Sequence, residues 1–124
     1  MSLRITSWNV NSLRSRIERV AAWLERHQPD VLCLQETKCS DADFPREALA
    51  EVGYQSVYSG QPNGLNGVAI LSKEEPLDVL AVLPGRDEDL HRRFLSARVC
   101  GLRVIDVYVP NGQALGSDAF FYKL

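Results

Sequence analysis

The sequence predicts an α/β fold in which one mixed, mostly antiparallel β-sheet carries helices on one face. Two strand patterns, residues 3–9 and 31–35, flank a helical pattern, as in a strand-helix-strand crossover. After residue 53, short strand-like runs follow one another with turn-forming residues between them, which is typical of an antiparallel meander. Together these patterns place helices early and antiparallel strands late in the chain.

The crossover is defined by its periodicities. Residues 3–8 alternate with a period of two, so the first strand ends at Asn9. Apolar residues at helical spacing then predict an amphipathic helix, which Pro29 ends because proline lacks an N–H and disfavours helix in the residue before it. The nearly continuous apolar run from Val31 to Gln35 predicts a buried central strand, with Glu36 at its C-terminal end.

The later elements depend on turn residues. Pro45 suits the first turn of a short helix, and Gly53 suits the left-handed residue that closes it. The strands expected beyond this helix are residues 54–59, 67–73, 77–83, 93–100 and 102–109. Ser117 or Asp118 would cap a further helix that has barely two turns before Leu124, so the chain is expected to be cut within an element.

Composition sets limits on function. The 124 residues, 45% hydrophobic and 24% charged, suit one compact globular domain. A net charge of -2 excludes an overall basic surface, so any contact with nucleic acid would need a local basic patch. The three cysteines lack metal-ligand spacing and indicate reduced thiols, and no apolar run is long enough to span a membrane. We therefore expect a cytoplasmic protein without a membrane partner.

Asn9 and Glu36 are the strongest candidates for chemistry. A carboxylate at the C-terminal edge of a buried strand is a suitable ligand for a hard cation such as magnesium, which prefers oxygen donors. An isolated Glu36 would more simply be a solvated strand end. Because Asn9 ends a strand one crossover earlier, however, adjacent strands would bring both side chains to one sheet edge, where ligands of α/β folds collect.

Four separated motifs carry a family resemblance. They are S-W-N-V-N (7–11), L-Q-E-T-K (34–38), G-V-A-I-L-S (67–72) and Y-V-P-N-G (108–112). In this order and spacing the chain resembles exonuclease III and the apurinic/apyrimidinic endonucleases of the endonuclease/exonuclease/phosphatase superfamily. The resemblance covers essentially the whole chain and implies that residues 1–124 are the N-terminal half of such a domain, truncated near the start of a helix.

The resemblance implies roles for individual residues. Glu36 would be a ligand of Mg²⁺, or of Mn²⁺ in its place, with Asn9 beside it as a metal-site and catalytic residue. Tyr108 would be catalytic, with its phenol directed at the scissile phosphate. Without the V-P-N-G that follows it, Tyr108 would be expected only to pack its ring at a strand end.

The implied partner is double-stranded DNA with abasic sites or 3′ ends. Lys38 and Asn111 would bind phosphate, although a solvated loop lysine and a turn asparagine are the ordinary alternatives. Arg92 and Arg93 form the densest basic spot, and a solvated turn is about as good an explanation for either arginine alone. Gly64 and Leu65 resemble a loop that some relatives insert into DNA, where an apolar wedge helps to kink the duplex.

The resemblance also implies what the chain lacks. The family is a four-layer α/β-sandwich, and the groups that activate water come from segments with no counterpart in these 124 residues. We therefore expect little or no nuclease activity from the isolated chain. A single sheet with helices on one face would leave an apolar face open, which predicts self-association. The alternatives are a phosphatase branch of the superfamily, and a non-catalytic DNA-binding or self-assembling half-domain.

Overall fold

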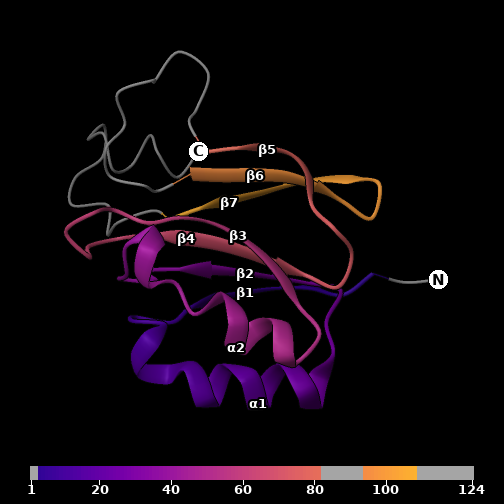
Figure 1. Cartoon of the computed structure of the whole chain (residues 1–124). Helices are drawn as coiled ribbons and strands as arrows, with labels where there is room; N and C mark the ends of the chain where they lie inside the picture. The colour runs from indigo at the N-terminus through magenta and orange to yellow at the C-terminus, as the bar shows by residue number, and fades with distance from the viewer. Residues whose placement is uncertain (1–2, 82–93, 109–124) are drawn as a thin grey trace, which may run out of the picture.

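A computed structural model describes residues 3–81 and 94–108, which form two stacked β-sheets with helices against the outer side of one sheet (Figure 1). The first sheet has the order β1-β2-β4-β3 and the second β5-β6-β7. The strands of the first sheet are β1 (Ile5–Asn9), β2 (Val31–Gln35), β3 (Gln55–Ser59) and β4 (Val68–Ser72). Those of the second are β5 (Leu77–Leu80), β6 (Phe94–Val99) and β7 (Leu102–Val107). The helices are α1 (Ile17–His27), preceded by a 3₁₀ turn (Arg14–Arg16), and α2 (Arg46–Glu51), preceded by a 3₁₀ turn (Asp41–Asp43).

The crossover forms as the periodicities predict. β1 and β2 are parallel and in register from Ile5 opposite Val31 to Asn9 opposite Gln35. Between them α1 buries its apolar face, and it ends where Gln28 adopts a left-handed conformation and donates its N–H to the Leu24 carbonyl. The two parallel strands therefore end at the same edge of the sheet.

The inner core lies between the helices and the first sheet. Leu32 and Leu34 of β2 are fully buried, and they pack with Leu24 of α1 and Leu49 of α2. Alternate residues of β2 face the other way, and Val31 is also buried. Because side chains of a strand alternate between faces, β2 needs cover on both sides.

The second sheet provides that cover, which corrects one part of the prediction. The α/β class and the helices on one face are confirmed, but β5, β6 and β7 form a separate sheet instead of extending the first. Its strands β6 and β7 bury the face expected to be open, and the residues of this second core are Val31, Cys33, Val68, Ile70, Leu95, Ala97, Val99 and Val104. Burial of apolar surface on both sheets explains why the strands stack in this way.

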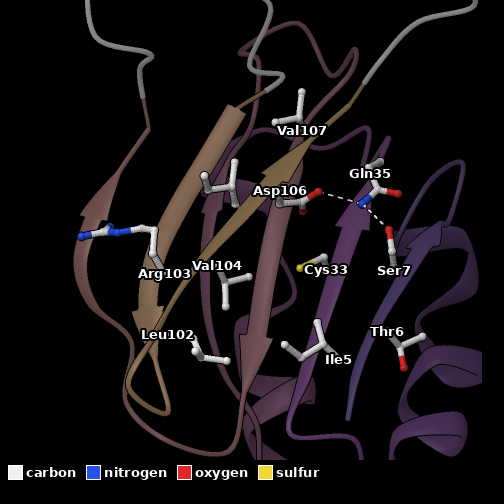
Figure 2. Close-up of a pocket in the computed structure, with 11 residues that line it drawn as sticks. Ile5, Thr6, Ser7, Cys33, Gln35, Leu102, Arg103, Val104, Asp106 and Val107 are labelled. Atoms are coloured by element: carbon white, nitrogen blue, oxygen red, sulfur yellow. Dashed lines mark hydrogen bonds between the residues drawn. The ribbon is translucent and has the colours of Figure 1, made fainter. Parts of the chain in front are cut away.

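Apolar side chains stay exposed on the edge strands of both sheets, including Leu77, Val79 and Leu80 of β5. Among the described residues, β1 and β7 each pair with a neighbour on one side only. Ile5 on β1 and Leu102 and Ile105 on β7 are exposed. A groove of about 520 Å³ runs between these two strands, with β2 contributing Cys33 and Gln35 to its wall (Figure 2).

The remaining predictions on chain environment concern cysteines and membranes. Cys33 and Cys39 are buried and Cys100 is partly exposed, and all three are free thiols, as expected. No helix in the described ranges has the length and apolar character needed to cross a membrane.

Candidate functional site

Asn9 and Glu36 are in direct contact at the C-terminal ends of β1 and β2. The Asn9 side-chain Nδ2 donates a hydrogen bond to Glu36 Oε2 at 2.5 Å. The Asn9 Oδ1 accepts the backbone N–H of Asn11 at 3.2 Å, so both ends of the amide are engaged. Asn9 therefore holds the Glu36 carboxylate in a defined orientation at the sheet edge.

Lys38 completes a small polar cluster with this pair. Its Nζ donates to Asn11 Oδ1 at 2.6 Å and lies 3.9 Å from Glu36 Oε1. The side chains of Lys38 and Glu36 are 37% and 23% exposed, so both remain accessible to a ligand. The cluster presents a carboxylate and an ammonium group side by side, as a site for a cation and a phosphate requires.

Left-handed backbone conformations are concentrated around this cluster. Five of the eight non-glycine residues with positive φ in the described ranges lie here: Asn11, Ser12, Glu36, Lys38 and Asn66. Such conformations are strained, and they persist where surrounding structure holds them, often at functional sites. Here the Ser12 N–H donates to the Glu36 carbonyl at 2.8 Å, and the Lys38 N–H to the Asn66 carbonyl at 2.8 Å.

The loop with Gly64 and Leu65 is attached to the same edge. Beyond the Lys38–Asn66 bond, the Thr37 N–H donates to the Gly67 carbonyl at 3.2 Å, which continues the pairing of β2 with β4 past the strand ends. Leu65 is 55% exposed, and Gly64 has a φ of 79°. The loop therefore places an exposed apolar side chain near Lys38.

The close approach of this loop depends on Gly67. Its φ is 96°, and a Cβ added there would lie 2.1 Å from Thr37 Oγ1. Thr37 is itself buried and Gly67 has no side chain, which allows the two loops to pack against each other.

Tyr108 comes from the other sheet. It directly follows β7, is partly buried, and packs against the second core. Two residues earlier, Asp106 accepts a hydrogen bond at Oδ1 from Gln35 Nε2 at 2.7 Å, and Gln35 Nε2 also donates to Ser7 Oγ at 3.0 Å (Figure 2). Since Gln35 precedes Glu36, this contact brings the end of β7 beside the end of β2.

Asp106 is the functional candidate that sequence reasoning missed. It is 2% exposed, and its Oδ2 has no hydrogen-bond partner among the described residues. Burial raises the pKa of Asp106 to about 7, against lowerings by the Gln35 amide and by the backbone N–H groups of Ala69 and Leu34. Burial, and secondarily Asp106, also raises the pKa of Cys33 to about 12. The available signal was one aspartate within the apolar pattern V-I-D-V of β7.

Two basic residues near the cluster have local partners. Arg16 Nη1 donates to the Asn11 carbonyl at 2.7 Å, which supports the loop after β1, and Arg14 pairs with Asp43 at 3.3 Å. The predicted DNA contacts at Arg92, Arg93 and Asn111 lie outside the described residues.

The cluster could supply only part of the coordination shell of a magnesium ion. Glu36 offers a carboxylate, and the described residues contain no group of three or more histidine, cysteine, aspartate or glutamate side chains that could hold a metal alone. Mg²⁺ commonly takes only one or two carboxylates and completes its shell with water and substrate phosphate. Glu36 therefore suits a site that the substrate helps to form.

Comparisons with known proteins show the family and the fold of the chain. Residues 6–122 match the Endonuclease/Exonuclease/phosphatase family. The chain is 36% identical over 123 residues to exodeoxyribonuclease III of Haemophilus influenzae, which covers 96% of this chain and 46% of that protein. It is similar to an AP endonuclease from Archaeoglobus fulgidus (43% identity, TM-score 0.84) and to the 3′ phosphatase NExo from Neisseria bound to a product DNA hairpin (47% identity, TM-score 0.88).

Each of those two structural matches covers 98% of this chain and 47% of the other. The chain thus spans about half the length of the relatives it matches. The expected resemblance to exonuclease III and its relatives is confirmed, and so is the extent of the match.

The packing of the two loops leads to a prediction at Gly67. Gly67→Ala should lower the free energy of unfolding by more than Gly101→Ala, measured by urea denaturation. Both glycines have positive φ, so both variants incur about 1–2 kcal/mol of backbone strain. Only Gly67 has a neighbour in contact, which should add roughly 1–3 kcal/mol of overpacking. Equal losses in the two variants would contradict the close approach to Thr37.

The raised pKa of Asp106 predicts a pH dependence of stability. The unfolded carboxyl titrates near 3.8 and the folded one near 7, so the native state binds more protons between these values. The free energy of unfolding should therefore fall as pH rises from 4 to 7, by on the order of a few kcal/mol. Asp106→Asn cannot ionise and should show a flatter profile in urea melts. Parallel profiles for the two proteins would show that Asp106 ionises normally.

Proposed function

The chain belongs to the endonuclease/exonuclease/phosphatase family, and we propose that it forms the Asn9–Glu36 part of a magnesium-dependent DNA phosphodiesterase of the exodeoxyribonuclease III type. The observation that supports this most directly is the contact of Asn9 with Glu36, and of Glu36 with Lys38, at strained strand ends. Accessible carboxylate, amide and ammonium groups in one cluster suit the recognition of a metal-bound phosphate.

Each residue of the cluster has a proposed role. Glu36 is the protein ligand of Mg²⁺, or of Mn²⁺ in its place, and the bound ion supplies neutralisation of charge on the phosphoryl oxygens. Asn9 belongs to the metal site through its hydrogen bond, which orients the Glu36 carboxylate. Lys38 offers its Nζ to a substrate phosphate and offsets the charge of Glu36 when no ligand is bound. Tyr108 contributes a phenol O–H as a catalytic hydrogen-bond donor.

The proposed substrate is double-stranded DNA with abasic sites or 3′ ends. Support comes from the solved 3′ phosphatase with a DNA hairpin, which is 47% identical to this chain over the part that the two proteins share. Leu65, exposed beside the Lys38 loop, is placed to act as an apolar wedge, with Gly64 allowing the turn. Arg92, Arg93 and Asn111 are further proposed phosphate contacts, carried from the resemblance alone.

The site needs groups beyond this cluster. Hydrolysis requires a base to activate water, and within the described ranges no histidine or second carboxylate makes a hydrogen bond or ion pair with Glu36. The chain spans about half of its relatives, so we propose that the remaining groups come from the part not matched and that this chain alone is inactive.

Other functions remain candidates with specific support. A 3′-phosphatase activity is favoured by the Neisseria relative, and it would use the same Glu36 site. A non-catalytic DNA-binding or self-assembling half-domain is the other alternative. Self-association would use the exposed Ile5 and Leu102 of the edge strands, or the outer face of the second sheet with Ile105, because β6 and β7 already cover the inner face of the first sheet. A cytoplasmic location stays a prediction.

The metal role of Glu36 is tested by calorimetry. Titration with Mg²⁺ or Mn²⁺ should give a binding signal for the wild-type chain that Glu36→Gln loses, because the amide cannot supply the charged ligand. Glu47→Gln is the matched control, since Glu47 is an exposed glutamate in the first turn of α2. An unchanged isotherm for Glu36→Gln would remove this residue from the metal site.

The phosphate role of Lys38 is tested by binding to an abasic duplex. Lys38→Ala should weaken binding and lower the slope of log affinity against log salt concentration by about 1. Lys73→Ala serves as the control, because Lys73 is exposed at the opposite end of β4. Equal salt slopes for the two variants would exclude Lys38 from the DNA interface.

Adding Mg²⁺ to the isolated chain and the abasic duplex should produce no cleavage. Cleavage would show that the site is complete.

A further inference from the structure

We propose that Asp106 and Gln35 are positioning residues, which hold Tyr108 of the second sheet at a set distance from the Asn9–Glu36 pair of the first sheet. This inference rests on the proposed function, because it assigns Tyr108 and Glu36 to one site. Its basis is the hydrogen-bonded chain Ser7–Gln35–Asp106, which we call the inter-sheet bridge (Figure 2).

Each member of the bridge is close in sequence to one site residue. Ser7 is two residues before Asn9, Gln35 is directly before Glu36, and Asp106 is two residues before Tyr108. A displacement of any member along its strand is therefore transmitted to a site residue through at most two peptide units. The distances of 3.0 Å from Gln35 Nε2 to Ser7 Oγ and 2.7 Å to Asp106 Oδ1 are those of well-formed hydrogen bonds.

The two sheets need such a directional contact. Their strands are hydrogen-bonded within each sheet, while the contact between sheets in the second core is made of apolar side chains such as Ile70 and Leu95. Apolar packing is not directional and defines a separation better than it defines a sliding position. The Gln35–Asp106 bond fixes β7 against β2 at the end of the strands, next to the site.

The energetics of Asp106 argue against a role in stability alone. The side chain is 2% exposed, and Oδ2 lacks a hydrogen-bond partner among the described residues. Removing a carboxyl from water has a free-energy cost that an apolar residue of similar size does not have. Val104, two residues earlier on the same face, is apolar and buried in the second core. We therefore explain the aspartate by its hydrogen bond to Gln35, which positions β7, and not by a gain in stability.

The test follows Tyr108 directly by fluorine NMR on chains labelled with fluorotyrosine. Tyr108→Phe identifies the Tyr108 signal among the four tyrosines. Asp106→Ala removes the bridge, and Asp106→Asn retains an oxygen that accepts from Gln35. Ser96→Ala is the matched control, because Ser96 is also 2% exposed and hydrogen-bonded in the second sheet, to Arg103. All spectra are recorded first without metal and then with Mn²⁺, whose paramagnetism broadens nearby signals.

Without metal, the Tyr108 signal should shift or broaden in Asp106→Ala, while Asp106→Asn and Ser96→Ala keep the wild-type signal. With Mn²⁺, broadening of Tyr108 should be weaker in Asp106→Ala than in the wild type, because paramagnetic broadening falls steeply with distance and loss of the bridge lets Tyr108 move away from Glu36. A Tyr108 signal in Asp106→Ala identical to wild type without metal overturns the proposal. Failure of Mn²⁺ to broaden wild-type Tyr108, or broadening that persists in Glu36→Gln, instead contradicts the proposed metal site.

Discussion

The parallel pairing of β1 with β2 is the constraint on which the site depends. Parallel strands must be joined by a crossover, and here α1 makes it, so both strands run in one direction and end at one edge. The register places Asn9 opposite Gln35, which leaves Glu36 one residue beyond the sheet. A shift of one residue would turn Asn9 to the other face and separate it from the carboxylate.

Local sequence patterns were sufficient to predict the elements, because apolar periodicity marks the crossover and turn-forming residues separate the later strands. The crossover, the short helix after Pro45 and the later strands all form within a few residues of the predicted bounds. Periodicity does not state which strands pair, so the separate sheet β5-β6-β7 was not foreseen. Strands that are apolar on both faces, such as β2 and β4, predict that both faces of the sheet are buried. They do not predict which element covers each face.

The same distinction applies to the site. Asn9 and Glu36 could be predicted because strand ends and motif agree on them, and Lys38 from the motif alone; the structure brings the three together. The contributions of Asn11 and Thr37 to the site could not be predicted from the sequence. They come from the left-handed backbone at Asn11 and from the buried packing of Thr37 against Gly67. These are tertiary effects that leave no periodic trace in the sequence.

Asp106 shows how stability and position conflict at this edge. Its raised pKa means that ionisation of the buried carboxyl works against folding. Yet apolar packing alone would leave the two sheets free to shift relative to each other by small amounts, and catalytic groups lose effectiveness when displaced by about 1 Å. Gln35 connects the two sheets, because its one amide nitrogen donates to both Ser7 of β1 and Asp106 of β7. A site divided between two sheets requires a polar contact of this kind, and its cost in stability follows from burying it.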